Sequence, residues 1–231
     1  MQEVDTMKDP VTEQIKSISL KYRNINKVVL FGSRARGDHT PNSDYDIAIF
    51  SNAMEHAEES RFLNEIDNIK TLSKIDPVFM KERHIGSDLY KNITRDGVTI
   101  MDKFQTKLEN YKKALARLHE SIADSKRFAN NLTFRDGVIQ RFELTSELAW
   151  KTIREYLLSE KVADINSPKS VMREAYHMNV ITDEDGWIQI LDDRNVTSHI
   201  YDEQEATDIY ERIAAHHMQL FDKLLDKLSQ S

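Results

Sequence analysis

The chain contains no cysteine. This absence excludes a disulfide framework, a thiolate metal site and a cysteine nucleophile. Long hydrophobic runs are also missing, since no stretch approaches the ~18 apolar residues that a membrane-spanning helix needs. Residues 1–5 are acidic and lack the basic and apolar regions of a signal peptide. We therefore expect a soluble, globular, cytoplasmic protein with no membrane partner.

Charged residues are abundant, but neither sign dominates strongly. The 231 residues include 39 acidic and 32 basic side chains, for a net charge of -7, and 39% are hydrophobic. The hydrophobic fraction is ordinary, which argues against wholesale disorder, and the length suits one large domain or two modest ones. The net negative charge argues against a broad basic surface for binding duplex DNA, although a local basic groove is compatible with this charge.

Residues 1–103 alternate between helical and strand-like patterns. A capping aspartate and a first-turn proline, Asp9 and Pro10, predict the start of a helix. The region therefore predicts a small α/β (α+β) domain with a mixed sheet of about four strands. Its expected strands are 27–31, 44–50, 74–80 and 98–101, and its further helices are 55–72 and 87–94.

Residues 104–231 contain no convincing strand and only two glycines, which favours an all-α helical bundle with short connections. Ser167 and Pro168 repeat the pairing of a cap with a first-turn proline. The expected helices are 104–128, 134–160, 168–179, 184–198 and 203–228. The boundary near 101–106 is a change of periodicity rather than a flexible linker.

One candidate site lies in the first half. Gly32 and Ser33 follow a strand, and Asp44 and Asp46 lead the next one, so alternation points both carboxylates to one face. Paired hard oxygen ligands select Mg²⁺ or Mn²⁺, while a glycine turn and a hydroxyl can hold a phosphate. Asp76, on the following strand, could supply a third carboxylate that activates an attacking hydroxyl. Taken singly, each feature is more often an ordinary turn or loop; their ordered combination favours a site.

The segments 32–37 (GSRARG) and 43–46 (SDYD) resemble the minimal nucleotidyltransferases of the DNA polymerase β-like superfamily. The resemblance covers roughly residues 10–103. It implies magnesium-dependent transfer of a nucleoside monophosphate from a triphosphate, usually ATP, to a hydroxyl. Asp76 matches the third carboxylate of the family, and Pro77 directly after it departs slightly from the pattern.

The same resemblance assigns roles to the other residues. Gly32 and Ser33 would hold the triphosphate, and Asp44 and Asp46 would bind the metal. Arg36 would touch phosphate. These roles agree with the chemistry read from the residues, in which the metal offsets charge on the triphosphate and positioning supplies the rest.

A second candidate site combines Arg194, His199 and Tyr201. Arginine binds phosphodiesters, and histidine is suited to proton transfer near neutral pH, which are the two roles a metal-free ribonuclease needs. On a continuous helix His199 would point away from the face that Arg194 and Tyr201 share, so the trio requires a helix end, a bend or a second copy. In the simpler alternative, His199 caps a helix and Arg194 forms an ion pair with Asp192 or Asp193.

The segments 134–157, 167–176 and 191–201 resemble the HEPN family, in the branch of nucleotidyltransferase substrate-binding proteins. The match spans roughly residues 104–228. HEPN proteins dimerise and often carry Arg-x4-6-His as a metal-independent ribonuclease site at the dimer interface. The resemblance implies that Arg194 and His199 form that site, with Tyr201 completing Arg-x4-His-x-Tyr, and that the chain is a homodimer through this region.

In related two-gene toxin–antitoxin systems the nucleotidyltransferase adenylylates that tyrosine and silences the ribonuclease. The chain resembles a fusion of both components, so we expect ATP as substrate, Tyr201 as acceptor and RNA as a further ligand. One alternative is transfer to an external small molecule, such as an aminoglycoside. A second is a ribonuclease with a non-catalytic N-terminal binding module, and a non-catalytic scaffold is the least favoured.

Two adjacent histidines, His216 and His217, could bind a metal, but a solvated helix face is the expected interpretation. Trp150 and its neighbours Phe142, Leu148 and Ile153 predict a buried helix stripe rather than a base-stacking platform.

Overall fold

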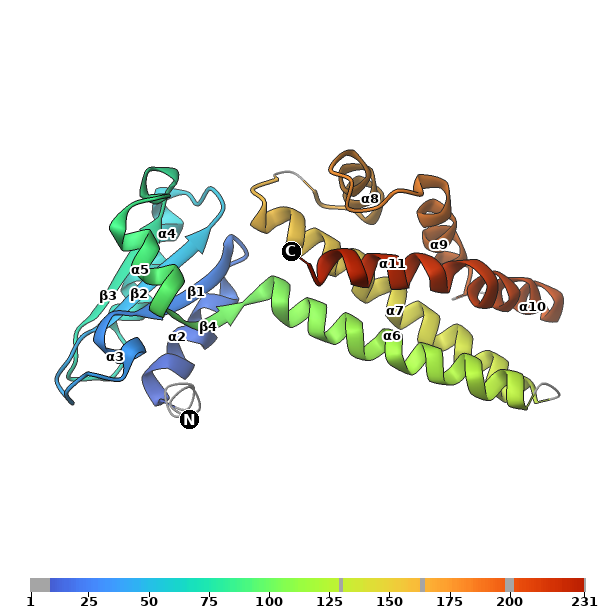
Figure 1. Cartoon of the computed structure of the whole chain (residues 1–231), viewed down its shortest axis with the longest axis horizontal. Helices are drawn as coiled ribbons and strands as arrows, with labels where there is room; N and C mark the ends of the chain where they lie inside the picture. The colour runs from blue at the N-terminus through green and yellow to red at the C-terminus, as the bar shows by residue number, and fades with distance from the viewer. Residues whose placement is uncertain (1–8, 129–130, 163–164, 198–201, 231) are drawn as a thin grey trace. The chain divides into compact units, whose positions relative to one another are not determined.

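The computed structural model describes residues 9–128, 131–162, 165–197 and 202–230. The chain divides into two compact units, Met1–Lys103 and Phe104–Ser231. Within these described ranges, Figure 1 shows strands only in the first unit, whereas the second is helical. The predicted fold class, a small mixed sheet with helices followed by an all-helical region, is therefore confirmed.

The N-terminal unit is built on a four-stranded sheet with the strand order β3-β2-β1-β4. The central strand β1 pairs antiparallel with β2 and β4, whereas β2 and β3 run parallel. Pro77 lies in β3 at the sheet edge, where a missing N–H donor is tolerated. The strands are β1 (Ile25–Phe31), β2 (Tyr45–Ser51), β3 (Ile75–Met80) and β4 (Val98–Asp102).

Side-chain alternation gives this sheet two unequal faces. The helices α2 (Pro10–Lys21) and α4 (His56–Asp67) contribute to a core that includes Ile47 and Ile49 of β2. The opposite face carries a much smaller cluster, in which Ala48 packs with Ile93 of helix α5 (Asp88–Asp96). Asp46 lies two residues before Ala48 and so points to this thinner face, where the sheet remains accessible.

Both predicted proline helix starts are confirmed. The carboxylate of Asp9 accepts a hydrogen bond from the Val11 amide at 3.2 Å, one residue after Pro10 opens α2. Ser167 accepts from the Ser170 amide at 3.2 Å at the start of α8 (Pro168–His177). Each cap satisfies a backbone donor that the first helical turn leaves without an intrahelical partner.

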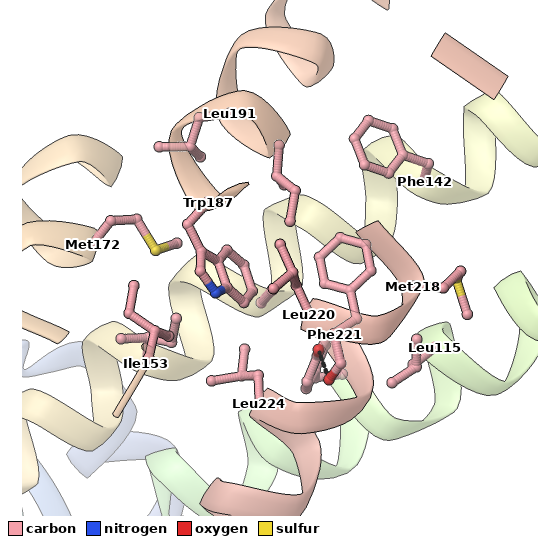
Figure 2. Packing of buried hydrophobic residues seen from close by; sticks show 14 of the residues in the cluster. Leu115, Phe142, Ile153, Met172, Trp187, Leu191, Met218, Leu220, Phe221 and Leu224 are labelled. Carbon is pink, nitrogen blue, oxygen red and sulfur yellow. Dashed lines mark hydrogen bonds between the residues drawn. The ribbon is translucent and has the colours of Figure 1, made fainter. Parts of the chain in front are cut away.

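The C-terminal unit packs its helices around one large apolar core (Figure 2). Trp187, 2% exposed, meets the ring of Phe221 edge-on with 5.7 Å between centroids. The buried Tyr111 hydroxyl donates to the Phe221 carbonyl at 2.8 Å, so this polar group of the core is satisfied. The remaining helices are α6 (Lys103–Arg127), α7 (Leu132–Ser159), α9 (Glu184–Thr197), α10 (Glu203–Arg212) and α11 (Met218–Leu228).

The helix expected over 203–228 is interrupted. A π-helical segment, η2 (Ile213–His217), separates α10 from α11. The wider turn shifts the helical register and places His217 at 0% exposure, with its ring stacked on Phe142 at 5.4 Å. The expectation of a solvated face is therefore wrong for His217, although the side chain of His216 remains 56% exposed.

Among the described residues, no helix has the length and apolar character required to cross a membrane.

Candidate functional site

The turn after β1 brings the backbone close to a carboxylate. Phe31 pairs with Asp46 in the β1–β2 ladder, and the next residue, Gly32, opens the short helix α3 (Gly32–Arg36) with φ of +73°. A Cβ at this position would collide with the Asp46 carboxylate and would also strain the backbone. Glycine is therefore required here for two separate reasons.

Three predicted carboxylates share this end of the sheet. Asp46 and Asp76 are register partners in the parallel β2–β3 pair. Burial raises the pKa of the Asp46 carboxyl above its ordinary value, and the charges of Asp76 and Asp44 raise it further. Lys74 and Arg36 oppose this shift. The structure thus brings Asp44, Asp46 and Asp76 within electrostatic reach of one another.

The carboxylates do not form a complete ligand set as they stand. Within the described ranges, no group of three or more histidine, aspartate or glutamate side chains is arranged to hold a metal ion. The Asp76 carboxylate lies 3.2 Å from Lys74 Nζ and its side chain is 52% exposed. Mg²⁺ needs only one or two carboxylates when substrate phosphates complete its shell. Burial and the neighbouring charges of Asp76 and Asp44 disfavour the ionised form of Asp46, and a cation beside it would relieve that cost. Asp44 and Asp46 therefore fit such an ion, and the assignment stays a prediction.

Arg34 is a structural residue that the sequence analysis missed. Its guanidinium, in a side chain that is largely buried, donates to the Ser43 carbonyl at 2.7 and 2.9 Å and to Ser73 Oγ at 3.1 Å. It also lies 3.8 Å from the Tyr45 ring centroid. These contacts fix the loop that delivers Asp44. Nothing in the sequence separates Arg34 from the nearby Arg36, since both follow the same strand.

Arg36 occupies a different environment. Its side chain is 47% exposed, and Nε lies 3.2 Å from the Asp38 carboxylate. Its charge helps to lower the pKa of Asp46, which places it beside the carboxylates. That position agrees with the phosphate contact expected of Arg36, which stays a prediction.

In the second unit, Arg194 projects from α9 toward Glu147 of α7. Arg194 Nη2 lies 3.0 Å from Glu147 Oε2, and Nη1 donates to the Asn195 side chain at 3.2 Å. The alternative pairing with Asp192 or Asp193 is therefore wrong. Consecutive helix residues point about 100° apart, which directs these carboxylates elsewhere.

Glu147 is the centre of this arrangement and was not foreseen as a site residue. It also accepts from Trp150 Nε1 at 2.9 Å and lies 2.8 Å from Lys151 Nζ. Burial alone would raise the pKa of Glu147, but the hydrogen bonds from Lys151 and Trp150 hold it below its ordinary value. Glu147 is thus a carboxylate that is ionised near neutral pH and orients Arg194.

His199 and Tyr201 lie outside the described residues. Helix α9 is described as far as Thr197, and Asp202 caps α10 through the amides of Gln204 and Glu205. The proposed ribonuclease site is therefore represented by Arg194 alone.

Comparisons with known proteins agree with both halves. Residues 106–230 match the family model "Nucleotidyltransferase substrate binding protein like", and residues 13–106 match "Polymerase beta, Nucleotidyltransferase". The chain therefore belongs to the nucleotidyltransferase substrate-binding family, and it carries a polymerase beta-type nucleotidyltransferase domain in the same polypeptide. The predicted resemblance to a fused toxin–antitoxin pair is confirmed at this level.

Individual relatives cover only parts of the chain. "Probable ribonuclease HepT" of Haemophilus influenzae is 36% identical over 81 residues, which are 33% of this chain and 56% of the relative. "Putative protein adenylyltransferase" of Methanocaldococcus jannaschii is 50% identical over 40 residues, 17% of this chain and 40% of the relative. The chain thus spans about half the length, or less, of these curated relatives.

A solved structure of the tri-AMPylated Shewanella oneidensis HEPN toxin in complex with MNT antitoxin is also similar. It is 20% identical, with a TM-score of 0.49, over 57% of this chain and 99% of that chain.

Proposed function

We propose that the N-terminal unit transfers AMP from ATP to a hydroxyl, and that this hydroxyl belongs to Tyr201 of the helical unit. The observation that carries the proposal is the close approach of Gly32 to the Asp46 carboxylate. Burial raises the pKa of that carboxyl, and the charges of Asp76 and Asp44 raise it further. Such a group of carboxylates, beside a turn that only glycine can adopt, suits a cation and a phosphate chain.

The chain's own residues would divide the work. The Ser33 hydroxyl and the turn at Gly32 would hold the triphosphate, and Arg36 would contact its oxygens. A divalent cation held by Asp44 and Asp46 would offset the charge of the phosphates.

The transfer requires that the acceptor tyrosine hydroxyl lose its proton. The tyrosine oxygen forms a bond to the α-phosphorus, the bond from that phosphorus to pyrophosphate breaks, and Asp76 accepts the hydroxyl proton. The Asp76 carboxylate is 52% exposed and is therefore accessible to an acceptor hydroxyl.

The modification would silence the second activity. In this proposal Arg194 binds an RNA phosphodiester and His199 transfers the proton, without a metal. An AMP group on Tyr201 would add bulk and negative charge two residues from His199, and so exclude RNA. The family membership and the ribonuclease relative support this part of the proposal.

Intact-protein mass spectrometry, before and after incubation with ATP and Mg²⁺, tests the transfer. We expect an AMP-sized gain, or its presence in the protein as purified. The gain should be absent from the Asp44→Asn/Asp46→Asn double variant and from Tyr201→Phe. Labelling of Tyr201→Phe at the parental level would remove Tyr201 as the acceptor. Unmodified protein that shows no gain in any form would overturn self-adenylylation.

RNA cleavage without Mg²⁺ or ATP tests the second activity. The unmodified chain should cleave, and Arg194→Ala and His199→Ala should not. Cleavage at the parental rate by both variants would end the ribonuclease assignment.

A further inference from the structure

A cavity of ≈ 320 Å³ lies beside Arg194, where α7, the start of α8 and α9 meet. Its volume falls at the lower end of the range found for small-molecule sites, about 300–1,000 Å³. Trp150 and Glu147 line it from α7, Lys169 from the first turn of α8, and Arg194 and Asn195 from α9. The cavity therefore combines an aromatic wall with groups of both charges.

The polar groups of this cavity are arranged for a ligand that carries an anion. The Arg194 side chain is 40% exposed. Lys169, 68% exposed, is held only loosely by Asp192, with 4.0 Å between Nζ and Oδ1. The positive end of the α8 helix dipole lies at the same place, because Pro168 is its first residue. One phosphate could bind between these cations.

Glu147 lies against Arg194, with 3.0 Å between Oε2 and Nη2, and adds an acceptor to the cavity. The Glu147 carboxylate is fixed by Trp150 Nε1 and Lys151 Nζ, and its pKa lies below the ordinary value, so it can only accept hydrogen bonds. A simple phosphate or a dicarboxylate would be repelled by Glu147. An aromatic ligand that lacks an anion would make no use of Arg194 and Lys169.

Ser146 adds an independent observation. The residue lines the cavity and is 1% exposed, and its hydroxyl has no hydrogen-bond partner among the described residues. A buried hydroxyl without a partner has lost its hydrogen bonds to water and gained none in return. A ligand polar group at this wall of the cavity could satisfy it.

An anion, N–H donors and a flat apolar body occur together in a nucleotide. We propose that this cavity binds a nucleoside monophosphate, with its phosphate on Arg194 and Lys169 and its base beside Trp150. Glu147 accepts from the amino group of adenine, guanine or cytosine, whereas uracil offers only its ring N3–H as a donor and binds more weakly. The inference rests on the proposed role of Arg194 in binding RNA and makes the cavity a base-recognising subsite next to that residue.

Two sources could supply such a nucleotide: an RNA strand, or an AMP group carried by the chain itself. Both present the same chemical groups to the cavity. A comparison of adenylylated with unmodified protein distinguishes the two sources.

The two tryptophans of the chain, Trp150 and Trp187, both belong to the helical unit. Their indole N–H resonances therefore report on this unit even when a nucleotide also binds elsewhere. We would titrate the full-length Asp46→Asn protein, which should be free of AMP, with AMP, CMP, GMP, UMP and inorganic phosphate. The Trp150 resonance is assigned from its absence in Trp150→Phe.

The expected result is a saturable shift of the Trp150 resonance with AMP, GMP and CMP, a weaker response to UMP, and none with inorganic phosphate. Lys169→Ala should weaken AMP binding about tenfold, the equivalent of one charge-assisted hydrogen bond. Lys223→Ala, which removes a lysine from a different cavity, should leave binding unchanged. Because Lys169 is exposed, loss of folding cannot explain its effect.

A Trp150 resonance that no nucleotide moves, or one that phosphate alone moves equally, would overturn the proposal. If AMP carried by the chain is the natural occupant, the Trp150 resonance of adenylylated wild-type protein is already shifted, and added AMP does not move it further. If RNA is the source, the modified and unmodified proteins respond alike. The titration of the Asp46→Asn protein does not depend on whether the chain adenylylates itself or cleaves RNA.

Discussion

Asp193 of α9 and His217 of η2 are 24 positions apart in the sequence, yet Asp193 Oδ2 lies 2.6 Å from His217 Nε2. Both side chains are buried, and Arg212 adds bonds of 2.7 and 2.9 Å to the same carboxylate. An ionised carboxylate only accepts hydrogen bonds, so His217 carries its proton on Nε2. Because Asp193 directly precedes Arg194, this cluster also fixes the helix that presents Arg194.

Asp193→Asn should destabilise the helical unit by about 3 kcal/mol, because it breaks a buried charge pair and leaves His217 and Arg212 poorly satisfied. Urea denaturation at pH 7 measures the loss. Asp192→Asn is the matched control, since Asp192 is exposed and only loosely paired. Equal urea midpoints for Asp193→Asn and Asp192→Asn would show that the cluster around Asp193 contributes little to the free energy of unfolding.

The pH dependence of this effect has a defined sign. Burial alone would raise the pKa of Asp193, but hydrogen bonds with His217 and Arg212 hold it well below its ordinary value. The stabilisation is therefore complete above the unfolded pKa of about 3.9 and is lost as pH falls toward the folded value. The stability gap between wild type and Asp193→Asn should stay constant from pH 7 to about 5 and narrow only in stronger acid.

Gly32→Ala should reduce nucleotidyl transfer by about 100-fold or more, since the new Cβ displaces the Asp46 carboxylate. Gly86→Ala is an informative control, because Gly86 has φ of +79° but a Cβ added there would meet nothing within 4 Å. Both variants should lose about 1 kcal/mol through backbone strain. Similar transfer rates in the two would refute the importance of the Gly32–Asp46 approach.

Asp46→Asn should make the metal-free protein more stable by about 1 kcal/mol while it abolishes transfer. The pKa of Asp46 is raised in the folded state by burial and by Asp76 and Asp44, so its ionised form disfavours folding near pH 7. Removal of the charge relieves this cost. Thermal unfolding should therefore show a higher Tm for the variant without Mg²⁺, and Mg²⁺ with ATP should raise the Tm of wild type only. A lower Tm for the variant without metal would contradict the assignment.

Arg34→Lys should affect mainly the stability of the protein, whereas Arg36→Lys should affect mainly the binding of ATP. Lysine cannot reproduce the paired bonds of Arg34 to Ser43, so we expect a loss of about 1–2 kcal/mol in unfolding free energy. Arg36 is exposed, and its replacement should leave stability unchanged and raise the KM for ATP. Chemical denaturation and transfer kinetics on both variants test this division. An unchanged KM in Arg36→Lys would exclude a bidentate phosphate contact, which lysine cannot make.

Much of the fold could be predicted because its signals are local. The starts of α2 and α8 follow from an aspartate or serine before proline, and the strands follow from short apolar runs. The η2 segment could not be predicted, since a π turn depends on tertiary contacts such as the stacking of His217 on Phe142. No periodicity in the sequence distinguishes it from a continuous α-helix.

The sites divide in a similar way. The proximity of Asp46 and Asp76 could be predicted, because adjacent strands bring residues of like register together. Glu147 and Arg34 could not, since their importance comes from partners 47 residues and up to 39 residues away in the chain. In a sequence rich in charged residues, the neighbours of an arginine or glutamate do not indicate which distant residue it will contact.

The proline in β3 affects how readily the chain can aggregate before folding is complete. An exposed strand edge is a template on which a neighbouring chain can add a strand and begin aggregation. Pro77 removes one backbone donor from that edge and so interrupts the template at its centre. The N-terminal sheet is synthesised before the helical unit. The β3 edge of this sheet is therefore less open to strand addition while the nascent chain is still on the ribosome.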